Sequence, residues 1–575
     1  MKNTIPFDPA SPYSIAYFSM EVGLMSEMPT YSGGLGILAG DTLKAAADLE
    51  IPLVGVTLLH RKGYFLQHLD AQGGQTESPS EWDPSDFLES VDNEIAIKLE
   101  GRTIHIRAWR YMIKGENGGS VPVYFMDTSS EKNSAWDQTL TDHLYGGDAR
   151  YRFCQEAVLG LGGVALLRSL RYYNIRAYHM NEGHSALLTL AVLKGYIGQR
   201  DLTSASPEDI EKLRRRCVFT THTPVPAGHD KFPMSLVKSI LGKGMSDFLD
   251  SSPAAADKVL NMTLLALMYS GYINGVSHQH EKISQDMFPD YPINSITNGV
   301  HAATWVSPPF KKLFDQHMEE WRHDSLYLRY AINLPLEEIR AAHQSAKRDL
   351  IREVDKRTGI LLSEEVMIIG FARRATAYKR ADLLFSDLDR LQGLAKSAGP
   401  LQIIFGGKAH PRDESGKEMI KRIFHAAGLM KGDITLVYLE GYDMALAKPL
   451  CAGVDLWLNT PRKPHEASGT SGMKAALNGV PSLSVLDGWW IEGHVEGVTG
   501  WSIDEGSGGG EEAEIRSLYH KLENKILPMY YHAPETYASV MRSAIALNGS
   551  FFTAQRMLFQ YLKNAYTANH GRQSD

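Results

Sequence analysis

The sequence predicts an α/β protein with two doubly wound domains that face each other across a cleft. Short runs rich in apolar and β-branched residues alternate with longer helical patterns along the whole chain, and this alternation is typical of parallel sheets with crossover helices. A chain of 575 residues also exceeds the size at which a single hydrophobic core stops growing. We therefore expect an N-terminal domain over residues 1–305 and a C-terminal domain over residues 306–575, whose last helix can pack back on the first domain.

Five strand candidates lie in each half of the chain. Those of the first half are Ser14–Met20, Pro52–Leu59, Val121–Met126, Ile175–Met180 and Val218–Thr221. Those of the second half are Val366–Phe371, Gln402–Phe405, Ile434–Leu439, Val454–Leu458 and Ser482–Val485. Helical patterns over Leu336–Lys356, Lys417–Ala427 and Ala513–Lys525 supply covering layers. Ligands of doubly wound folds bind outside the carboxyl ends of the strands, so we expect the active site in the interdomain cleft.

Charge and cysteine content argue against several classes of protein. The formal net charge of −8 gives no broad basic surface for nucleic acid or an anionic membrane. Cys154, Cys217 and Cys451 stand in apolar surroundings without metal-ligand spacing, so we expect buried free thiols. The first residues lack the apolar core of a signal peptide, and no apolar stretch is long enough to span a bilayer. We expect a soluble protein of the reducing cytoplasm.

The strongest functional signal lies in residues 461–479. A loop of small and hydroxyl residues, 468–472, leads into an apolar helical run, and the amides at such a helix start bind anions. An ordinary helix junction capped by Thr470 or Ser471 would give the same pattern. Lys474 favours the functional interpretation, because the positive end of the helix dipole disfavours its charged form and leaves the amine available to an aldehyde. A phosphorylated aldehyde such as pyridoxal phosphate would use both features.

The residues His-Glu-Ala-Ser-Gly-Thr-Ser-Gly-Met-Lys-Ala-Ala-Leu-Asn-Gly of this segment resemble the cofactor-lysine segment of the α-glucan (glycogen, starch, maltodextrin) phosphorylases. Five further blocks resemble that family in the same order, at 31–36, 144–148, 221–224, 296–301 and 372–380. The resemblance implies a short bacterial-type member with the GT-B glycosyltransferase architecture. Its N-terminal domain would lie on the glucan and phosphate side, and its C-terminal domain would bind pyridoxal 5'-phosphate.

The resemblance also implies a reaction. The enzyme would transfer the non-reducing terminal glucosyl unit of an α-1,4-glucan or maltodextrin to inorganic phosphate with retention, giving α-D-glucose 1-phosphate. The phosphate of the Lys474-bound cofactor would act as proton partner of the substrate phosphate. The family suggests a homodimer, and the sequence itself leaves the oligomeric state open.

Site residues carry over one by one onto matching positions. Arg374 and Lys379 follow a strand candidate and could hold a phosphate by a guanidinium fork and a point charge. The resemblance makes these two catalytic, together with Lys474 and His222. It places Gly34 and Tyr378 with Arg374 and Lys379 at the substrate phosphate. It places Thr470, Ser471, Gly472, Arg373, Tyr442 and Trp305 with Lys474 at the cofactor. It places His222, Asn298, Glu466, Ser468, Gly469 and Asp148 at the sugar.

Several positions depart from the longer phosphorylases. Thr376 and Ala377 replace a His-Glu pair, Arg373 replaces a lysine, and Ser471 replaces a glycine. The loop 147–149 lacks the asparagines usual there. The chain also starts almost at its first strand candidate, so we expect the N-terminal arm for phosphorylation and nucleotide control, and with it allosteric control, to be absent.

Two other functions have to be weighed. A nucleotide-sugar-dependent α-glucan synthase of the same architecture could use Arg374, Lys379 and Glu466 on a diphosphate, but it would not need Lys474 in its loop. A non-catalytic glucan-binding relative would have lost the phosphate cluster, which is present here. The run His179–His184 resembles a zinc pattern only superficially, because it follows a strand and lacks the His-Glu-x-x-His order. We predict no metal.

Overall fold

The computed structural model describes residues 13–430, 432–503 and 510–567. The chain divides into two compact units. The first unit comprises Met1–Tyr64, Pro79–Thr297 and Met557–Asp575, and the second comprises Phe65–Ser78 and Asn298–Arg556. The sequence-based boundary at residue 305 remains a prediction.

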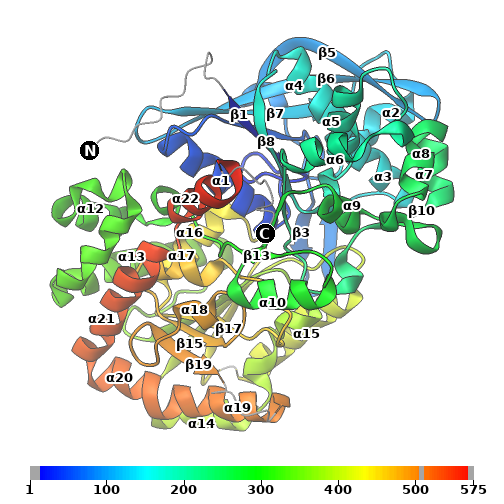
Figure 1. Ribbon diagram of the computed structural model, residues 1–575. Coiled ribbons are helices and arrows are strands. Elements are labelled where there is room, and N and C mark those ends of the chain that lie inside the picture. The colour runs from blue at the N-terminus through cyan, green and yellow to red at the C-terminus, as the bar shows by residue number, and fades with distance from the viewer. Residues whose placement is uncertain (1–12, 431, 504–509, 568–575) are drawn as a thin grey trace. The chain divides into compact units, whose positions relative to one another are not determined.

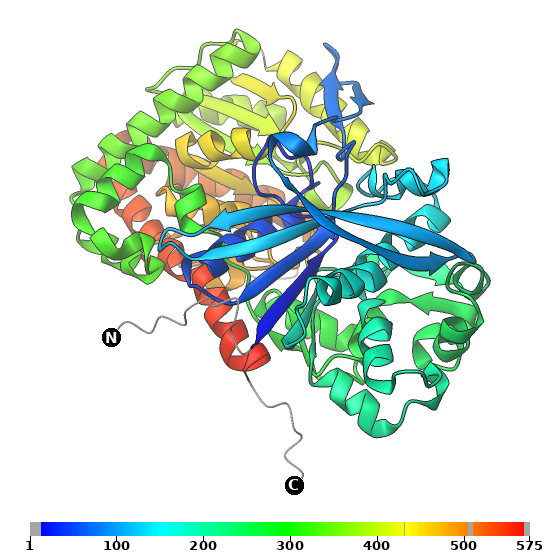
Figure 2. The ribbon, with the colours of Figure 1, turned by 90° about the horizontal axis from the view of Figure 1, so that it is seen from above.

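The first unit is built on a nine-stranded sheet of order β13-β12-β9-β8-β1-β2-β7-β6-β5. Figures 1 and 2 show several of its strands side by side. The seven strands from β13 to β7 are parallel, and β6 and β5 add an antiparallel ribbon at the edge. The strands are β1 (Ser14–Ser19), β2 (Leu53–Leu58), β5 (Glu89–Leu99), β6 (Arg102–Lys114), β7 (Ser120–Asp127), β8 (Ile175–Asn181), β9 (Cys217–Thr220), β12 (Tyr272–Gly275) and β13 (Asn294–Ser295). All five strand candidates of the first half are confirmed.

Helices cover this sheet, and glycines let one of them approach closely. The helices include α1 (Gly34–Asp48), α3 (Ala149–Ala157), α4 (Gly163–Ser169), α5 (Leu188–Ile197), α6 (Pro207–Arg214), α7 (Met234–Leu241), α8 (Lys243–Asp250), α9 (Met262–Met268) and α10 (His278–Met287). A Cβ at Gly163 would lie 2.4 Å from the ring of Phe18 on β1, so only glycine permits this contact between helix and sheet. Cys154 and Cys217 are buried free thiols in this core, as Cys451 is in the second unit.

The second unit is built on a fully parallel six-stranded sheet of order β16-β15-β14-β17-β18-β19. The strands are β14 (Met367–Ala372), β15 (Leu401–Gly406), β16 (Thr435–Leu439), β17 (Leu456–Asn459), β18 (Ser482–Val485) and β19 (Gly500–Ile503). The five candidates of the second half are confirmed, and β19 is additional. The helices include α12 (Pro308–His317), α13 (Leu336–Thr358), α14 (Leu388–Ser397), α15 (Glu414–Leu429), α16 (Met444–Gly453), α17 (Ser471–Leu477), α19 (Gly510–Lys521), α20 (Leu527–His532) and α21 (Pro534–Ser543).

Both sheets have the strand order of a doubly wound fold. Counted along the chain, the parallel strands of each unit run outward in one direction from the first strand and then continue on its other side. The order therefore reverses between β1 and β8 in the first unit and between β14 and β17 in the second. Loops that leave these neighbouring strands diverge, which opens a binding crevice at their carboxyl ends. The predicted fold class is confirmed for both units.

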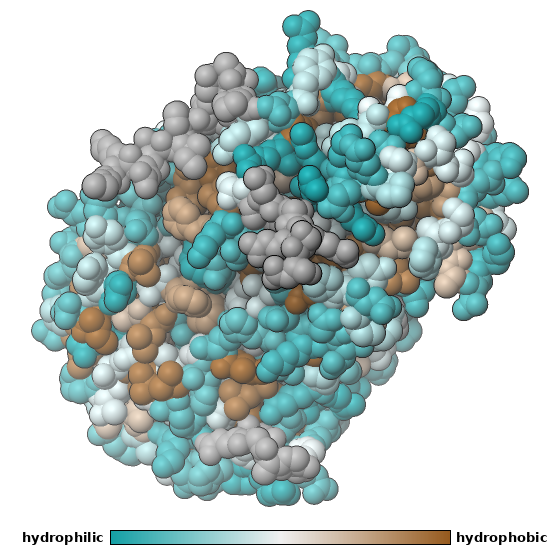
Figure 3. Space-filling view, viewed as in Figure 1, coloured by the Kyte–Doolittle hydropathy of each residue, from teal (hydrophilic) through white to brown (hydrophobic). Residues whose placement is uncertain are grey.

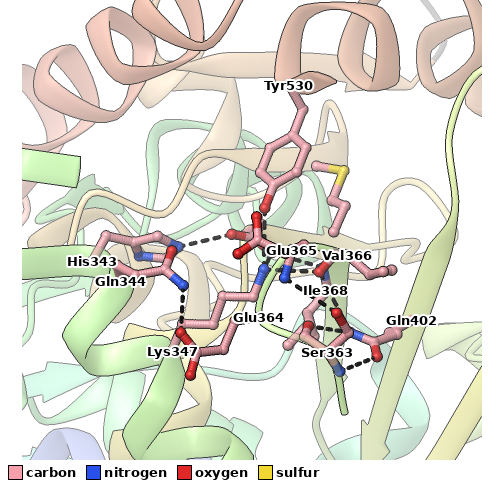
Figure 4. A network of polar contacts seen from close by, with 12 residues as sticks. His343, Gln344, Lys347, Ser363, Glu364, Glu365, Val366, Ile368, Gln402 and Tyr530 are labelled. Carbon is pink, nitrogen blue, oxygen red and sulfur yellow. Dashed lines mark hydrogen bonds and ion pairs between the residues drawn. The ribbon is translucent and has the colours of Figure 1, made fainter. Parts of the chain in front are cut away.

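A buried ion pair joins the strands at the opposite, amino-terminal end of the second sheet (Figure 4). Lys347 of α13 is fully buried and lies 2.7 Å from the carboxylate of Asp455, which precedes β17. The same carboxylate accepts bonds from the Ile368 amide of β14 (2.7 Å) and pairs with His343 (2.9 Å). Burial alone would raise the pKa of Asp455, but the Lys347 ammonium holds it below its usual value. The Lys347 ammonium also donates to Tyr530 of α20 (3.1 Å).

We expect Lys347→Ala to lower the free energy of unfolding by about 3–5 kcal/mol, because it leaves the Asp455 carboxylate buried without its counter-charge. Urea unfolding measures this loss. Lys356→Ala, an exposed change on the same helix, is the matched control and should stay within about 0.5 kcal/mol. Equal effects of the two changes would show that the pair does not hold the unit together.

Six buried or partly buried histidines of the first unit have lowered pKa values. Burial lowers the pKa of each below its usual 6.5, to about 3 or 4. They are His60, His179, His184, His222, His229 and His280. His179 is enclosed by Tyr566 (2.6 Å to Nδ1) and by Thr220 (2.8 Å to Nε2). The folded state therefore binds fewer protons than the unfolded chain below pH 6.5, and its stability falls as the pH falls through that value.

We expect His179→Gln to reduce this acid sensitivity. A histidine kept neutral in the fold costs about 2 kcal/mol of stability at pH 5, relative to its contribution above pH 7. The difference in unfolding free energy between pH 7.5 and pH 5, measured in urea, should shrink by about that amount in the variant. His425→Gln, at an exposed position, should leave the difference unchanged. The same slope in the wild type and His179→Gln would contradict the assignment.

Candidate functional site

In the first unit, a carboxylate organises the loop that leaves β1. Glu21 accepts bonds from the amides of Ser32 (2.6 Å) and Gly33 (3.3 Å) and from the Tyr145 hydroxyl (2.8 Å). Gly34 then begins α1; it is exposed, and a Cβ there would meet no described atom within 4 Å. The described structure therefore does not require glycine at position 34, whereas close approach of a ligand to the backbone would require it.

The second polar group of this unit follows β8, the neighbour of β1. Asn181 receives a hydrogen bond from His222 Nε2 (2.6 Å), and its own amide donates to Ser19 (3.1 Å). Glu182, at φ +74°, accepts from the His222 amide (2.8 Å) and the Thr223 hydroxyl (2.9 Å). A positive φ is strained for glutamate, and such strain is concentrated at functional sites. Asn181 thus fixes the ring of His222, and Glu182 fixes its backbone.

His222 is a neutral ligand rather than a cation. Burial, with a smaller contribution from His280, His179 and His184, lowers its pKa to about 3. Because the Asn181 side chain uses its nitrogen toward Ser19, its oxygen faces His222, so the imidazole carries its proton on Nε2. Nδ1 is then a hydrogen-bond acceptor.

In the second unit, three charged side chains meet at the carboxyl ends of β14 and β17. Arg373 (2.5 Å) and Lys379 (2.6 Å) both contact Oε2 of Glu466, and all three side chains are nearly buried. Burial acts to raise the pKa of Glu466, but the two cations hold it at about 2. Arg373 also donates to Asn459, the last residue of β17 (3.1 Å). Two buried cations around one carboxylate leave a local excess of positive charge, which suits an anionic ligand.

Asp487 and Gly488 hold the segment from Glu466 to Gly469. The Asp487 carboxylate accepts from the Glu466 amide (2.9 Å), and burial together with the Glu466 charge raises its pKa to about 6. Gly488 has φ +55°, and a Cβ there would lie 2.3 Å from the Ser468 carbonyl oxygen. The Trp489 amide donates to that same oxygen (2.9 Å). The loop after β18 therefore fixes the loop after β17.

The predicted cofactor lysine lies in the short helix α17. Lys474 is 7% exposed, and its Nζ lies 4.0 Å from the ring centroid of Trp305. Thr470 occupies the N-cap position without a side-chain capping bond, and the Ser471 hydroxyl accepts from Trp457 (3.1 Å). Neither hydroxyl therefore caps the helix, so the ordinary capped helix junction considered for this segment is not what the structure has. Gly472 is required by packing, because a Cβ would lie 2.8 Å from Trp489.

Three buried polar atoms in the loops after β14 and β17 find no hydrogen-bond partner within the described residues. They are Nε of Arg373, Oγ1 of Thr376 and Oγ of Ser468. A buried donor left unpaired is costly, so an anionic group bound in these loops would satisfy an existing need. The residues present therefore fit a phosphate-bearing aldehyde.

The other predicted residues lie in different surroundings. Tyr378 lies beside the site, with its ring centroid 4.3 Å from Lys379 Nζ. Arg374 is exposed, and Tyr442 packs against the core of the second unit. Asn298 is buried with an unpartnered Oδ1 within the described chain. Asp148 instead caps α3 by accepting from the Tyr151 amide (2.9 Å), which gives it a structural role.

Sequence reasoning missed four polar residues that hold the site. They are Glu21, Asn181, Glu182 and Asp487. Asn181 and Glu182 directly follow a strand candidate, and this position could have revealed them. The structure shows no group of three potential metal ligands among its described residues, and the prediction of no metal remains a prediction.

Two doubly wound sheets, each with polar side chains where the order of its parallel strands reverses, define an α/β protein that binds its ligands at the carboxyl ends of the strands. The model of the carbohydrate phosphorylase family matches residues 247–571. A maltodextrin phosphorylase of Thermococcus litoralis is 39% identical, over 96% of this chain and 70% of its own. Glycogen phosphorylases of Aquifex aeolicus and Mycobacterium tuberculosis are each 34% identical, over 96% and 97% of this chain and 86% and 71% of their own. The chain belongs to the carbohydrate phosphorylase family.

We expect Asn181→Ala to impair the enzyme without unfolding it. The change frees the His222 ring from its fixed orientation, which should lower kcat/KM about 10- to 100-fold. Steady-state kinetics and a thermal melt measure the two effects. Asn174→Ala, at an exposed position just before β8, is the control and should keep wild-type kinetics. Wild-type kinetics in Asn181→Ala would show that the ring needs no such support.

Proposed function

We propose that the protein is an α-1,4-glucan phosphorylase that transfers a non-reducing terminal glucosyl unit to inorganic phosphate with retention, releasing α-D-glucose 1-phosphate. The observation that carries this proposal is the meeting of Arg373 and Lys379 on the buried carboxylate of Glu466, in the loops that lead to Lys474. The relatives named maltodextrin and glycogen phosphorylase support it, because each aligns with nearly the whole chain.

The loop after β14, residues 373–380, carries several cations and is called the cationic loop; it would bind the substrate phosphate. Arg374 and Lys379 supply the charge, and Gly34 leaves its backbone open to an anion. Without phosphate, Glu466 keeps Lys379 charged and in place. An incoming phosphate dianion would compete with Glu466 for the same donors, so no rearrangement of the strands would be needed.

The first unit would orient the sugar. His222 is neutral and fixed by Asn181, so it can bind a sugar hydroxyl without adding a repelling charge to the developing oxocarbenium ion. Glu182 fixes the backbone around His222, whose carbonyl would stabilise that ion. In the second unit, Asn298, Ser468 and Gly469, with Glu466, would bind further hydroxyls.

Pyridoxal 5'-phosphate is the cofactor that the site fits. Lys474 would hold it covalently, with Trp305 and Tyr442 around it and with Arg373, Thr470, Ser471 and Gly472 on its polar side. When bound, its phosphate group supplies proton exchange with the substrate phosphate. In this proposal the chain itself binds the two anions, screens their repulsion and excludes water from the sugar.

The alternative is a nucleotide-sugar-dependent α-glucan synthase of the same architecture. Such an enzyme could bind a diphosphate with the cationic loop, but it would have no use for a lysine buried against Trp305. We further propose an α-1,4-glucan or maltodextrin, inorganic phosphate and glucose 1-phosphate as partners, cytoplasmic location and a homodimer. Within the described part of the chain, no helix combines the length and apolarity needed to cross a membrane.

We expect borohydride reduction of the purified protein, followed by peptide mass mapping, to reveal a pyridoxyl adduct on Lys474. Lys474→Ala should show no adduct and no phosphorolysis of maltooligosaccharides, with its melting temperature close to that of the wild-type protein prepared without cofactor. Lys448→Ala, an exposed change on α16, should keep both adduct and activity.

An unmodified Lys474 in protein produced with ample pyridoxal phosphate would favour the synthase. Full phosphorolysis by Lys474→Ala would exclude the proposed mechanism.

A further inference from the structure

The residue after Lys379 has an unusual backbone and a buried charge. Arg380 has φ +46°, in the left-handed region that side-chain-bearing residues seldom adopt. The residue is 5% exposed although it carries a guanidinium. Such a conformation persists only where surrounding contacts determine it. The contacts of Arg380 therefore identify what holds its backbone in this conformation.

Hydrogen bonds of Arg380 connect the loop after β14 to the loop after β17. Its Nε donates to the Thr460 carbonyl (3.0 Å) and its Nη2 to the Pro461 carbonyl (2.7 Å). The Thr460 hydroxyl returns bonds to the carbonyls of Lys379 (3.1 Å) and Arg380 (2.9 Å). The Lys379 carbonyl and both the carbonyl and the side chain of Arg380 are thus bonded to the segment that leads to Glu466.

A third segment completes the anchor. Nη1 of Arg380 lies 2.5 Å from Oε2 of Glu514 on α19, and the two side chains are 6% and 9% exposed. A second contact, to Glu511 at 3.4 Å, involves a carboxylate that is 50% exposed and adds little. The buried pair connects the loop after β14 to a helix that follows β19. Loss of one partner would leave the other charge buried and unpaired.

We propose that Arg380 is a positioning residue for phosphate binding, which sets the place of the Lys379 ammonium through its anchor on Glu514 and on the loop after β17. Lys379 Nζ then stays 2.6 Å from Glu466, while the guanidinium of the next residue, Arg380, is held by Glu514. The proposal rests on the proposed function, because it assumes that Lys379 binds the substrate phosphate.

Lysine at position 380 provides a mild test. Arg380→Lys keeps the positive charge but has a single nitrogen, so it cannot donate to two carbonyls and to Glu514 in the same fixed geometry. Glu514→Gln keeps the size of the partner and removes its charge. Both changes should move the Lys379 ammonium, and they leave every proposed sugar-binding residue unsubstituted. We expect the KM for inorganic phosphate to rise about tenfold, with the KM for maltoheptaose within about twofold of wild type.

A matched pair in the same unit serves as control. Arg390 of α14 and Glu523 lie 3.1 Å apart and also connect an earlier segment of the unit to the C-terminal helices, but they are 37% and 39% exposed. Arg390→Lys and Glu523→Gln should keep both KM values within about twofold. Lys379→Ala serves as a reference for complete loss of the ammonium.

Calorimetric titration of each holoenzyme with inorganic phosphate gives a second readout that does not depend on turnover. Weaker phosphate binding in Arg380→Lys and Glu514→Gln, with unchanged maltoheptaose binding, would support the proposal. Unchanged phosphate affinity in Arg380→Lys, or equal loss of phosphate and maltoheptaose affinity, would overturn it. If the wild type binds phosphate but catalyses no phosphorolysis, the proposed function fails while the titrations still decide the role of Arg380.

Discussion

The buried pair of Lys347 and Asp455 is the interaction on which the second unit depends. Asp455 stands before β17 and binds the Ile368 amide of β14, so one carboxylate fixes the register of the two strands between which the sheet order reverses. The backbone carbonyl of Asp455 also accepts from Tyr537 of α21 (2.6 Å). A charge pair in a dry interior is tolerated only when its remaining lone pairs are satisfied, and here neighbouring elements satisfy them. At the other end of the same two strands lie Lys379 and Glu466.

The two units use the same topology with different electrostatics. In each, a buried carboxylate follows a strand at the reversal point. Glu182 accepts backbone amides and a hydroxyl, and burial raises its pKa. Glu466 is surrounded by Arg373 and Lys379, which hold its pKa at about 2 against the effect of burial. Beside Glu182 the first unit presents a neutral histidine, His222, whereas the second unit presents two cations around one carboxylate. Figure 3 shows apolar residues interspersed with polar ones on the viewed face.

The strands of both sheets could be predicted where they are buried and apolar. All ten candidates are present, with ends that differ by at most two residues. The ribbon of β5 and β6 was missed because its residues alternate between buried and exposed, a period-two pattern that is weaker than an apolar run. Strands β12, β13 and β19 have only two to four residues, and each contains glycine or asparagine, which are depleted in strands. In the site, Lys379 was predicted from its charge after a strand candidate, and Arg373 and Glu466 from the family resemblance. Asn181, Glu182 and Asp487 were not predicted, because their role is to hold other residues.

The sequence by itself determined the alternation of strands and helices, the residue types at the strand ends and the family to which they point. These properties are local, since they depend on side-chain chemistry and spacing along the chain. Only the tertiary structure decided which charges meet. Lys379 and Glu466 are 87 residues apart, and they touch because β14 and β17 are neighbours in the sheet. It also decided that His222 is neutral, because the burial that lowers its pKa comes from segments distant in sequence. Partner and protonation state follow from packing, which spacing along a chain does not specify.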